Sequence, residues 1–243
     1  MSCATGKKPV TQSEKTPLQA ILIGEVAPLG DRNASSGIAK HPVRDPLWLG
    51  ENGFVGDNQA DTKNHGGPEK AVHHYPRDHY AAWYEEMGAH PLLAVPGAFG
   101  ENLSTYGLDE ETVALGDVFR LGKAVVEVSQ GRQPCWKLNS RFGVSTMAYR
   151  VQTTGRTGWY YRVVQEGRVS PDDHLERLER PMPEWPLKRL WQILYVKTLD
   201  RGELEEMAAL EKLPEGWRRY AQRRLASGKV EDWNRRLKGA EQD

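Results

Sequence analysis

The chain is poor in cysteine, has no long apolar run and carries no net charge. Its 243 residues include two cysteines, Cys3 and Cys135, which are too few and too far apart for a disulfide framework. Lys and Arg together number 33, as do Asp and Glu, so no overall charge draws the chain toward nucleic acid or a membrane surface. No apolar run approaches the roughly 18 residues of a membrane span. The polar start of the chain also lacks the apolar core of a secretory signal. We therefore expect a globular protein of the reducing cytoplasm.

Short apolar runs separated by glycines and other turn residues fill residues 18–180. Such closely spaced runs predict a mainly β domain whose antiparallel sheet is closed or sandwiched. We expect strands at residues 18–26, 71–75, 101–105, 116–121, 124–128, 159–165 and 175–178. Two helices interrupt this pattern, one over residues 78–87 and one that begins near Cys135. Residues 1–17 are expected to form a disordered leader.

The composition changes at residues 181–186, where three prolines in six residues predict a linker. Beyond it the apolar residues recur at helical spacing over 187–194, 204–213 and 217–225. We therefore expect a small C-terminal domain of three helices over residues 181–243. Aromatic and cationic side chains alternate in its last helix, which is typical of either nucleic-acid binding or an amphipathic packing face. The neutral chain favours packing, and nucleic acid is not an expected partner.

Cys135 is the residue whose surroundings point most directly to chemistry. The segment Ser129–Cys135 follows an alternating strand pattern, and Gly131 and Pro134 end that strand. Arg132 and Lys137 lie close to the thiol in sequence, and nearby cations favour the thiolate, which attacks electrophiles and binds soft metals. The alternative is a buried structural cysteine, since cysteine is common in protein cores.

A second segment, residues 56–75, has the composition of an anion-binding turn. His65 is followed by Gly66 and Gly67, which allow backbone amides to approach an anionic group, and Lys70 adds charge. A purely structural turn remains an alternative.

Other polar residues of this half of the chain allow further sites. His73 and His74 point to opposite faces of the expected strand, so at most one of them can reach a given site. A zinc set of His65, His74, His79 and Asp57 has a spacing that matches no zinc template. The segment 99–104 either forms a simple bulge or brings Asn102 and Ser104 to a ligand.

Taken together, these segments resemble the MOSC family, named for the C-terminal domain of molybdenum cofactor sulfurase. The matching pieces occur in the family order within residues 20–180: Gly56-Asp57, His65-Gly66-Gly67, Lys70-Ala71-Val72, Phe99-Gly100-Glu101-Asn102-Leu103, Leu115-Gly116-Asp117, Val128-Ser129-Gln130, Arg132 and Pro134-Cys135. The proline-rich linker and helical tail look like the YiiM-type branch, which carries a C-terminal 3-alpha domain. Gly131 departs from the pattern, because a proline is more often expected there.

The resemblance implies a MOSC-type β-barrel with Cys135 at the mouth of a pocket. It also implies a molybdenum cofactor of the molybdopterin type, with Cys135 as the protein ligand of the molybdenum. The pterin carries phosphate, so its site needs amides and fixed positive charge. The candidate cofactor-binding residues are Lys40, Gly66, Gly67, Lys70, Asn102, Ser104 and Arg132. For a single lysine, solvated surface charge is the alternative.

The activity implied by the resemblance is reduction of N-hydroxylated compounds, such as hydroxylaminopurine base analogues, with electrons from an unidentified donor protein. His65 or Asp57 is the expected proton donor in that reaction. Family analogy and the eight tryptophans lead us to expect a homodimer. Two alternatives remain open. Cys135 could carry a persulfide in sulfur transfer, although a cysteine desulfurase domain does not fit in 243 residues, or the chain could bind the cofactor or a nucleotide without turnover.

Overall fold

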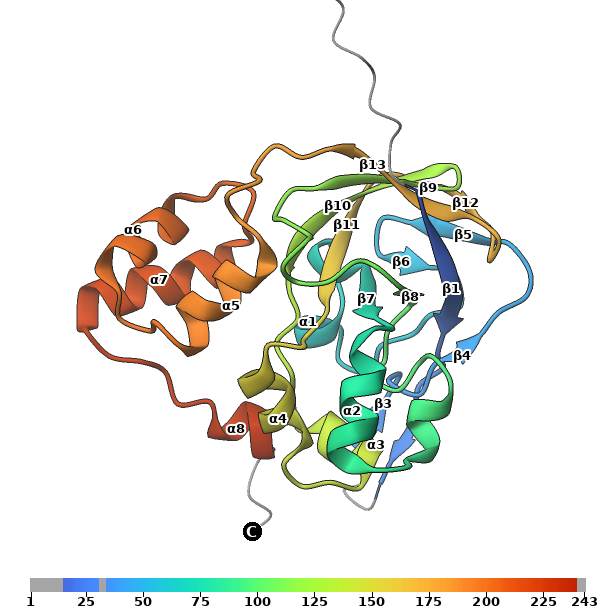
Figure 1. Ribbon diagram of the computed structural model, residues 1–243, viewed down its shortest axis with the longest axis horizontal. Coiled ribbons are helices and arrows are strands. Elements are labelled where there is room, and N and C mark those ends of the chain that lie inside the picture. The colour runs from blue at the N-terminus through green and yellow to red at the C-terminus, as the bar shows by residue number, and fades with distance from the viewer. Residues whose placement is uncertain (1–14, 31–33, 240–243) are drawn as a thin grey trace, which may run out of the picture.

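A closed β-barrel forms the centre of the molecule (Figure 1). The computed structural model describes residues 15–30 and 34–239. Seven strands follow one another in the order β13-β9-β10-β11-β7-β8-β1, and β1 pairs back with β13 to close the barrel, while β4 extends the sheet from β1. All pairings are antiparallel except that of β7 with β8. The bounds are β1 (Lys15–Ile23), β4 (His41–Pro42), β7 (Val72–Pro76), β8 (Leu103–Thr105), β9 (Val118–Leu121), β10 (Ala124–Gly131), β11 (Trp159–Gln165) and β13 (His174–Glu179).

The barrel strands confirm the predicted β-barrel and the strand pattern on which it rests. One boundary differs, because β1 begins at Lys15 and the residues Lys15, Thr16 and Pro17 pair with β13. They were assigned to the leader because their composition is polar. These residues pair with a strand about 160 residues later in the chain, and such a pairing leaves no pattern in the local sequence. The rest of the expected leader, residues 1–14, lies outside the described residues.

Besides β4, five short strands outside the barrel were not predicted. They form a three-stranded sheet in the order β12-β5-β6 and a hairpin of β2 with β3. Their bounds are β2 (Ala27–Leu29), β3 (Ala34–Ser36), β5 (Leu47–Gly50), β6 (Gly53–Phe54) and β12 (Gly167–Val169). Strands of two to four residues are too short to show an alternation of apolar and polar side chains.

Short helices cover one end of the barrel and enclose a second, aromatic core (Figure 1). In that core the rings of Tyr75 and Phe99 stack with centroids 4.0 Å apart, beside the fully buried Trp83. The helices are α2 (His79–Met87), η2 (Pro91–Ala94), α3 (Lys137–Phe142) and α4 (Met147–Thr154). Two further short helices, α1 (Thr62–His65) and η1 (Pro68–Lys70), precede β7 in the chain. The predicted helices α2 and α3 are confirmed.

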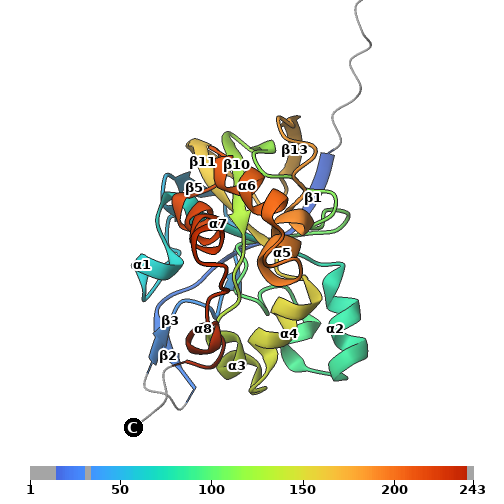
Figure 2. The same cartoon turned by 90° about the vertical axis from the view of Figure 1, so that its left-hand side faces the viewer.

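The C-terminal helices pack on the barrel through one continuous hydrophobic core (Figures 1 and 2). The three predicted helices are α5 (Leu187–Tyr195), α6 (Arg201–Ala209) and α7 (Glu215–Ser227). Trp185, inside the predicted linker, is 3 % exposed, and its carbonyl accepts a hydrogen bond from the Leu115 amide at 2.9 Å. The linker is therefore held firmly against the barrel.

A fourth helix, α8 (Asn234–Lys238), follows in the tail and was not predicted. It leaves the other C-terminal helices and packs against α4 (Figure 2). With five residues, it is too short for its periodicity to be recognised. Among the described residues, no helix has the length and apolar character needed to cross a lipid bilayer.

Candidate functional site

Cys135 lies at the junction of a barrel strand and a short helix. β10 ends at Gly131, and the Arg132 amide then donates to the Gly158 carbonyl at 2.9 Å, so the chain stays attached to β11 as it leaves the sheet. The Cys135 carbonyl accepts a hydrogen bond from the Leu138 amide at 3.0 Å, which opens the first turn of α3. Cys135 is 8 % exposed and lines a cavity.

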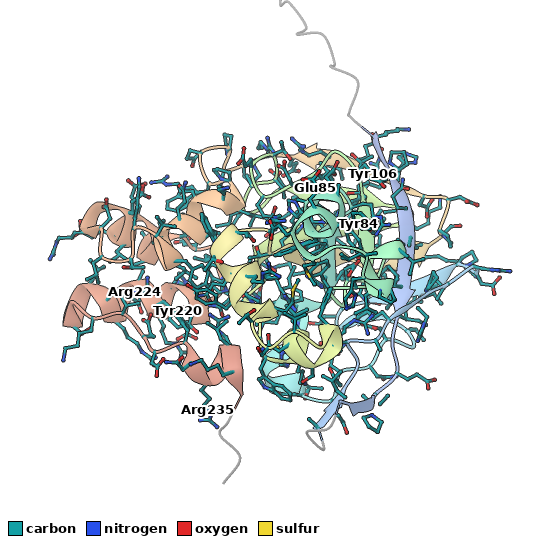
Figure 3. The ribbon with its side chains drawn as sticks, turned by 60° about the horizontal axis from the view of Figure 1, so that its bottom comes forward. Tyr84, Glu85, Tyr106, Tyr220, Arg224 and Arg235 are labelled. Carbon is teal, nitrogen blue, oxygen red and sulfur yellow. The ribbon has the colours of Figure 1, made fainter. Side chains whose placement is uncertain are left out.

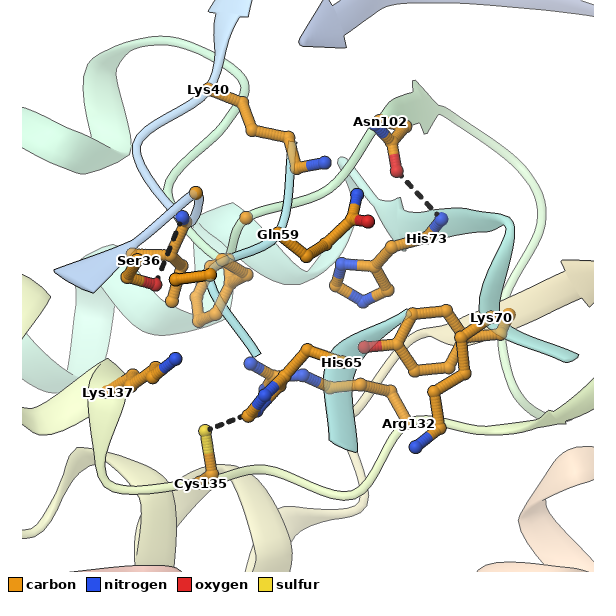
Figure 4. Close-up of a pocket in the computed structure, with 16 residues that line it drawn as sticks. Ser36, Lys40, Gln59, His65, Lys70, His73, Asn102, Arg132, Cys135 and Lys137 are labelled. Atoms are coloured by element: carbon orange, nitrogen blue, oxygen red, sulfur yellow. Dashed lines mark hydrogen bonds between the residues drawn. The ribbon is translucent and has the colours of Figure 1, made fainter. Parts of the chain in front are cut away.

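Segments far apart in sequence converge around this thiol and line a cavity that is partly open to solvent (Figure 4). We call this space the cationic cavity, because Lys40, Lys70, Arg132 and Lys137 line it and none of its described lining residues is acidic. The other lining residues are Ser36, Gly37, Ile38, Gln59, Ala60, His65, His73, Phe99, Gly100, Asn102, Cys135 and Tyr160. Six of the ten residues predicted for the site therefore meet here: Cys135, His65, Lys40, Lys70, Asn102 and Arg132.

His65 is the direct neighbour of the thiol. Its Nε2 lies 3.4 Å from Cys135 Sγ, and its Nδ1 lies 3.6 Å from a carboxylate oxygen of Asp61 (Figure 4). Burial lowers the pKa of His65 to about 4, with a further contribution from the charge of Lys137. The imidazole is therefore neutral at pH 7, so it can share the thiol proton but carries no acidic proton of its own as an imidazolium.

Asp57 lies behind the cavity wall and ties that wall together. Its carboxylate accepts hydrogen bonds from Lys40 Nζ at 2.5 Å, Asn102 Nδ2 at 2.9 Å, Gln59 Nε2 at 3.0 Å and the Gly24 amide at 2.9 Å. Its side chain is 1 % exposed. Asp57 is therefore a buried ion-pair partner of Lys40, and this position does not bring it to a ligand in the cavity.

Asn102, which directly precedes β8, belongs to the same hydrogen-bond network. Its Oδ1 accepts a hydrogen bond from the His73 amide at 3.0 Å, and its Nδ2 also donates to the Leu22 carbonyl at 3.0 Å. Burial lowers the pKa of Lys40, while the charge of Asp57 opposes that shift. Since Lys40 is paired with Asp57, the charge that Lys40 offers to a ligand in the cavity is largely balanced.

Arg132 is the cation whose hydrogen bonding is incomplete. Its Nη1 is buried without a hydrogen-bond partner among the described residues, although the guanidinium also interacts with Tyr160. Burial lowers the pKa of Lys70, which makes its ammonium a better proton donor than an exposed lysine. Burial raises the pKa of Tyr160, so its hydroxyl keeps its proton at neutral pH. Together with Lys137, these side chains can bind an anion next to the thiol.

The remaining predicted residues lie away from the cavity lining. Ser104 is fully buried on β8, where its Oγ has no hydrogen-bond partner among the described residues. Gly66 packs against Thr62 and Gln59, whereas Gly67, at φ +88°, faces open space. A sequence motif does not show which way the backbone of a turn faces. It therefore could not show that these glycines lie outside the cavity lining.

Of the two adjacent histidines, only His73 reaches the cavity, as strand alternation predicts. Its Nε2 is buried without a partner among the described residues, and burial holds its pKa well below the usual value. His74 contacts Tyr161 Oη at 3.0 Å and Thr105 Oγ1 at 2.9 Å, and His79 lies 2.7 Å from a Glu110 carboxylate oxygen. Within the described part of the chain, no three His, Cys, Asp or Glu side chains assemble as a metal site.

A second cavity lies on the side of Cys135 that faces the C-terminal helices, and we call it the helix-side cavity. It is also partly open to solvent. Gln130, Gly131, Gln133, Tyr220 and Arg236 line it, and it shares Cys135, His65, Lys70 and Tyr160 with the cationic cavity. The thiol is thus accessible from two differently lined spaces.

Comparison with known proteins agrees with this architecture. Residues 61–176 match the family model of the MOSC domain, and residues 185–228 match that of the YiiM-like 3-alpha helix domain. The protein YiiM of Escherichia coli is 44% identical over 204 residues, which cover 84% of this chain and 91% of that protein. The chain belongs to the MOSC family.

The solved structures and one further MOSC-family relative extend this comparison. The crystal structure of YiiM from Escherichia coli superposes with a TM-score of 0.78 at 36% identity, covering 92% of this chain and 98% of the other. A protein of Gibberella moniliformis named "Reductase" is 38% identical over 177 residues, covering 72% of this chain but 31% of that longer protein. The Escherichia coli YiiM structure therefore shares nearly the whole architecture, whereas the fungal protein matches this chain over about a third of its own length.

Proposed function

We propose that this MOSC-family protein is a reductase of N-hydroxylated compounds, including hydroxylaminopurine base analogues, that works with a bound molybdenum cofactor. The observation that carries the proposal is the position of the Cys135 thiol at the edge of a cationic cavity whose Arg132 has a buried, unpartnered nitrogen. The fungal relative named as a reductase supports the reaction type.

The residues of the cationic cavity fit a phosphate-bearing cofactor. A buried donor without a partner is unfavourable by about 1–3 kcal/mol, and a phosphate oxygen at Arg132 Nη1 would remove that cost. Lys70 and Lys137 add positive charge to the lining. Asn102 and Asp57 would act indirectly, because their hydrogen bonds hold the cavity wall.

Cys135 would hold the metal of that cofactor. A thiolate is a soft ligand that suits a thiophilic metal, and ligation requires loss of the thiol proton. Neutral His65, 3.4 Å from Sγ, can accept this proton and pass it on. When bound, the cofactor would supply the two-electron redox chemistry that the side chains of the chain lack.

The protons of the reaction must come from the protein or from water. An N-hydroxylated substrate takes up two electrons and two protons, its N–O bond breaks, and an amine and water form. Lys70 is the best-placed donor, because it lines both cavities and burial lowers its pKa. Tyr160 keeps its hydroxyl proton and can orient the leaving oxygen. Lys70 therefore replaces His65 and Asp57 as the proposed proton donor.

The contact of Cys135 with His65 also favours a second candidate, transfer of sulfur through a Cys135 persulfide. A thiol beside a histidine in a cationic cavity has the arrangement of a nucleophile and its base. In that case the activity would require a sulfur donor and would not require molybdenum.

The test is reduction of hydroxylaminopurine by cofactor-loaded protein supplied with a chemical electron donor. Cys135→Ser should abolish turnover while the fold persists, because an alcohol is a poor replacement for a thiolate ligand. The matched control is Cys3→Ser, the same change at the other cysteine of the chain, which should keep the wild-type rate. Equal rates in wild type and Cys135→Ser would exclude this role of the thiol, and activity of metal-free protein would exclude the cofactor.

A further inference from the structure

The C-terminal helix α8 is hydrogen-bonded to the loop that carries Cys135. The Arg236 guanidinium on α8 donates to the Pro134 carbonyl and to Gln152 Oε1, the latter at 2.5 Å. The Trp136 amide donates back to the Arg236 carbonyl at 2.8 Å. Because Pro134 and Trp136 flank Cys135, the position of α8 determines the position of the thiol.

The helix-side cavity, between this loop and α7, has walls of a different chemistry from the cationic cavity. Two amide side chains, Gln130 and Gln133, line it together with the phenol ring of Tyr220, which lies on α7 (Figure 3). Its cations are Arg236, which is hydrogen-bonded to the Cys135 loop, and Lys70, which it shares with the cationic cavity. A side-chain amide offers both a hydrogen-bond donor and an acceptor. It can therefore pair with the donor and acceptor nitrogens at the edge of a neutral heterocycle.

These wall residues are held in place before any ligand binds. The Gln130 amide donates to the Glu69 carbonyl at 2.9 Å, and the Gln133 amide approaches Tyr195 Oη at 3.4 Å. The Tyr220 ring contacts the Trp233 ring edge-to-face, with centroids 5.1 Å apart. A fixed aromatic ring beside fixed amides is a preorganised surface for a planar ring.

We propose that the helix-side cavity binds the planar heteroaromatic ring of the substrate, with Tyr220 stacking on the ring and Gln133 hydrogen-bonding to its edge. The C-terminal helices then supply part of the substrate site, while the cationic cavity takes the phosphate-bearing cofactor. The two ligands meet at Cys135, His65 and Lys70, which line both cavities. This inference rests on the proposed function for the identity of the substrate.

Binding of 2-aminopurine, a planar base whose fluorescence is quenched on stacking, tests the inference with the full-length chain in metal-free and cofactor-loaded forms. Tyr220→Ala should weaken binding by about tenfold, and Tyr220→Phe should retain it because the ring remains. Gln133→Ala should also weaken binding without loss of the ring. The matched control is Tyr84→Ala, an exposed tyrosine on α2 that lies outside the helix-side cavity (Figure 3).

Kinetics with hydroxylaminopurine provide the second measurement. Tyr220→Ala should raise KM by a similar factor and leave kcat and the bound molybdenum nearly unchanged. Weaker 2-aminopurine binding in a chain without reductase activity would support the ring site and reject the proposed function. Wild-type affinity and KM in both Tyr220→Ala and Gln133→Ala, with reductase activity intact, would overturn the ring site alone.

Discussion

Arg132 and Arg141 allow a direct comparison between an arginine that we propose binds the cofactor and one that supports the fold. Arg132 Nη1 has no hydrogen-bond partner among the described residues, and the side chain interacts with Tyr160. An unsatisfied buried donor costs about 1–3 kcal/mol, whereas one hydrogen bond contributes about 1 kcal/mol. Arg132→Met removes both effects. The free energy of unfolding of the cofactor-free protein should therefore stay the same or rise by up to about 2 kcal/mol.

The same substitution should weaken cofactor binding strongly. A charge-assisted hydrogen bond contributes about 1.5–3 kcal/mol, which corresponds to roughly a tenfold to 150-fold change in affinity. Arg132→Lys should fall between wild type and Arg132→Met, because it keeps the charge but loses the forked donor geometry. Molybdenum retained after dialysis against a cofactor competitor measures this affinity, and urea unfolding followed by tryptophan fluorescence measures stability.

Arg141→Met is the control. Arg141 Nε donates to the Ala98 carbonyl at 2.8 Å, and its Nη2 donates to the Gly97 carbonyl at 2.7 Å. Its loss should destabilise the cofactor-free protein by about 2–4 kcal/mol, because both buried carbonyls lose their donors. If Arg132→Met destabilises as much as Arg141→Met and still binds the cofactor normally, Arg132 serves the fold and our reasoning about its unpaired nitrogen is wrong.

Three further predictions concern the tail, the histidine and assembly. Arg224→Met should lower the free energy of unfolding by about 3–5 kcal/mol in urea, because it leaves the Glu231 carboxylate without its buried partner at 2.7 Å. The pKa of His65 is about 4 in the folded chain and 6.5 in the unfolded chain. As pH falls from 6.5 to 4, the imidazole therefore takes up a proton in the unfolded chain but not in the folded one. Stability should decline over that interval, and His65→Asn should reduce the slope of the urea midpoint against pH. Light scattering should find a homodimer of the 27.4 kDa chain, and a purely monomeric species at micromolar concentration would contradict this.

The sequence was sufficient to predict the barrel strands because each carries a local pattern. The hairpin of β9 and β10, with Gly122-Lys123 between them, shows two alternating runs around a short turn. The strands β5, β6 and β12 have two to four residues each, and the pairing of β12 with β5 joins segments more than 100 residues apart. Local patterns cannot report such pairings, which depend on the closed barrel beneath them.

The site could be predicted in its composition but less well in the roles of its residues. Cys135, Lys70 and Arg132 belong to recognisable motifs, and the fold brings them to one cavity. Asp57 belongs to a motif as well, yet its carboxylate is used within the wall by Lys40. Sequence adjacency does not reveal which face of a turn a side chain occupies, so this distinction required the structure.

The sequence did not predict that C-terminal helices line a cavity at Cys135. Tyr220 and Arg236 lie about 85 to 100 residues after Cys135 in sequence. The helix of Tyr220 was interpreted as either a nucleic-acid-binding or a packing helix, and the helix of Arg236 was not predicted. Gly131 is informative in retrospect, because a Cβ there would approach the Trp217 ring of α7 to 3.3 Å. Its departure from the family pattern marks the place where the tail meets the cysteine loop.

The central claim is that Cys135 ligates molybdenum, and metal analysis of freshly purified protein tests it most directly. Wild type and Cys3→Ser, made in cells that synthesise the cofactor, should each retain about one molybdenum per chain, because the thiolate is intact in both. Cys135→Ser should retain less than about a tenth of that amount after dialysis, since an alcohol is a poor ligand for this metal. Full molybdenum content in Cys135→Ser, or none in wild type, would contradict the account.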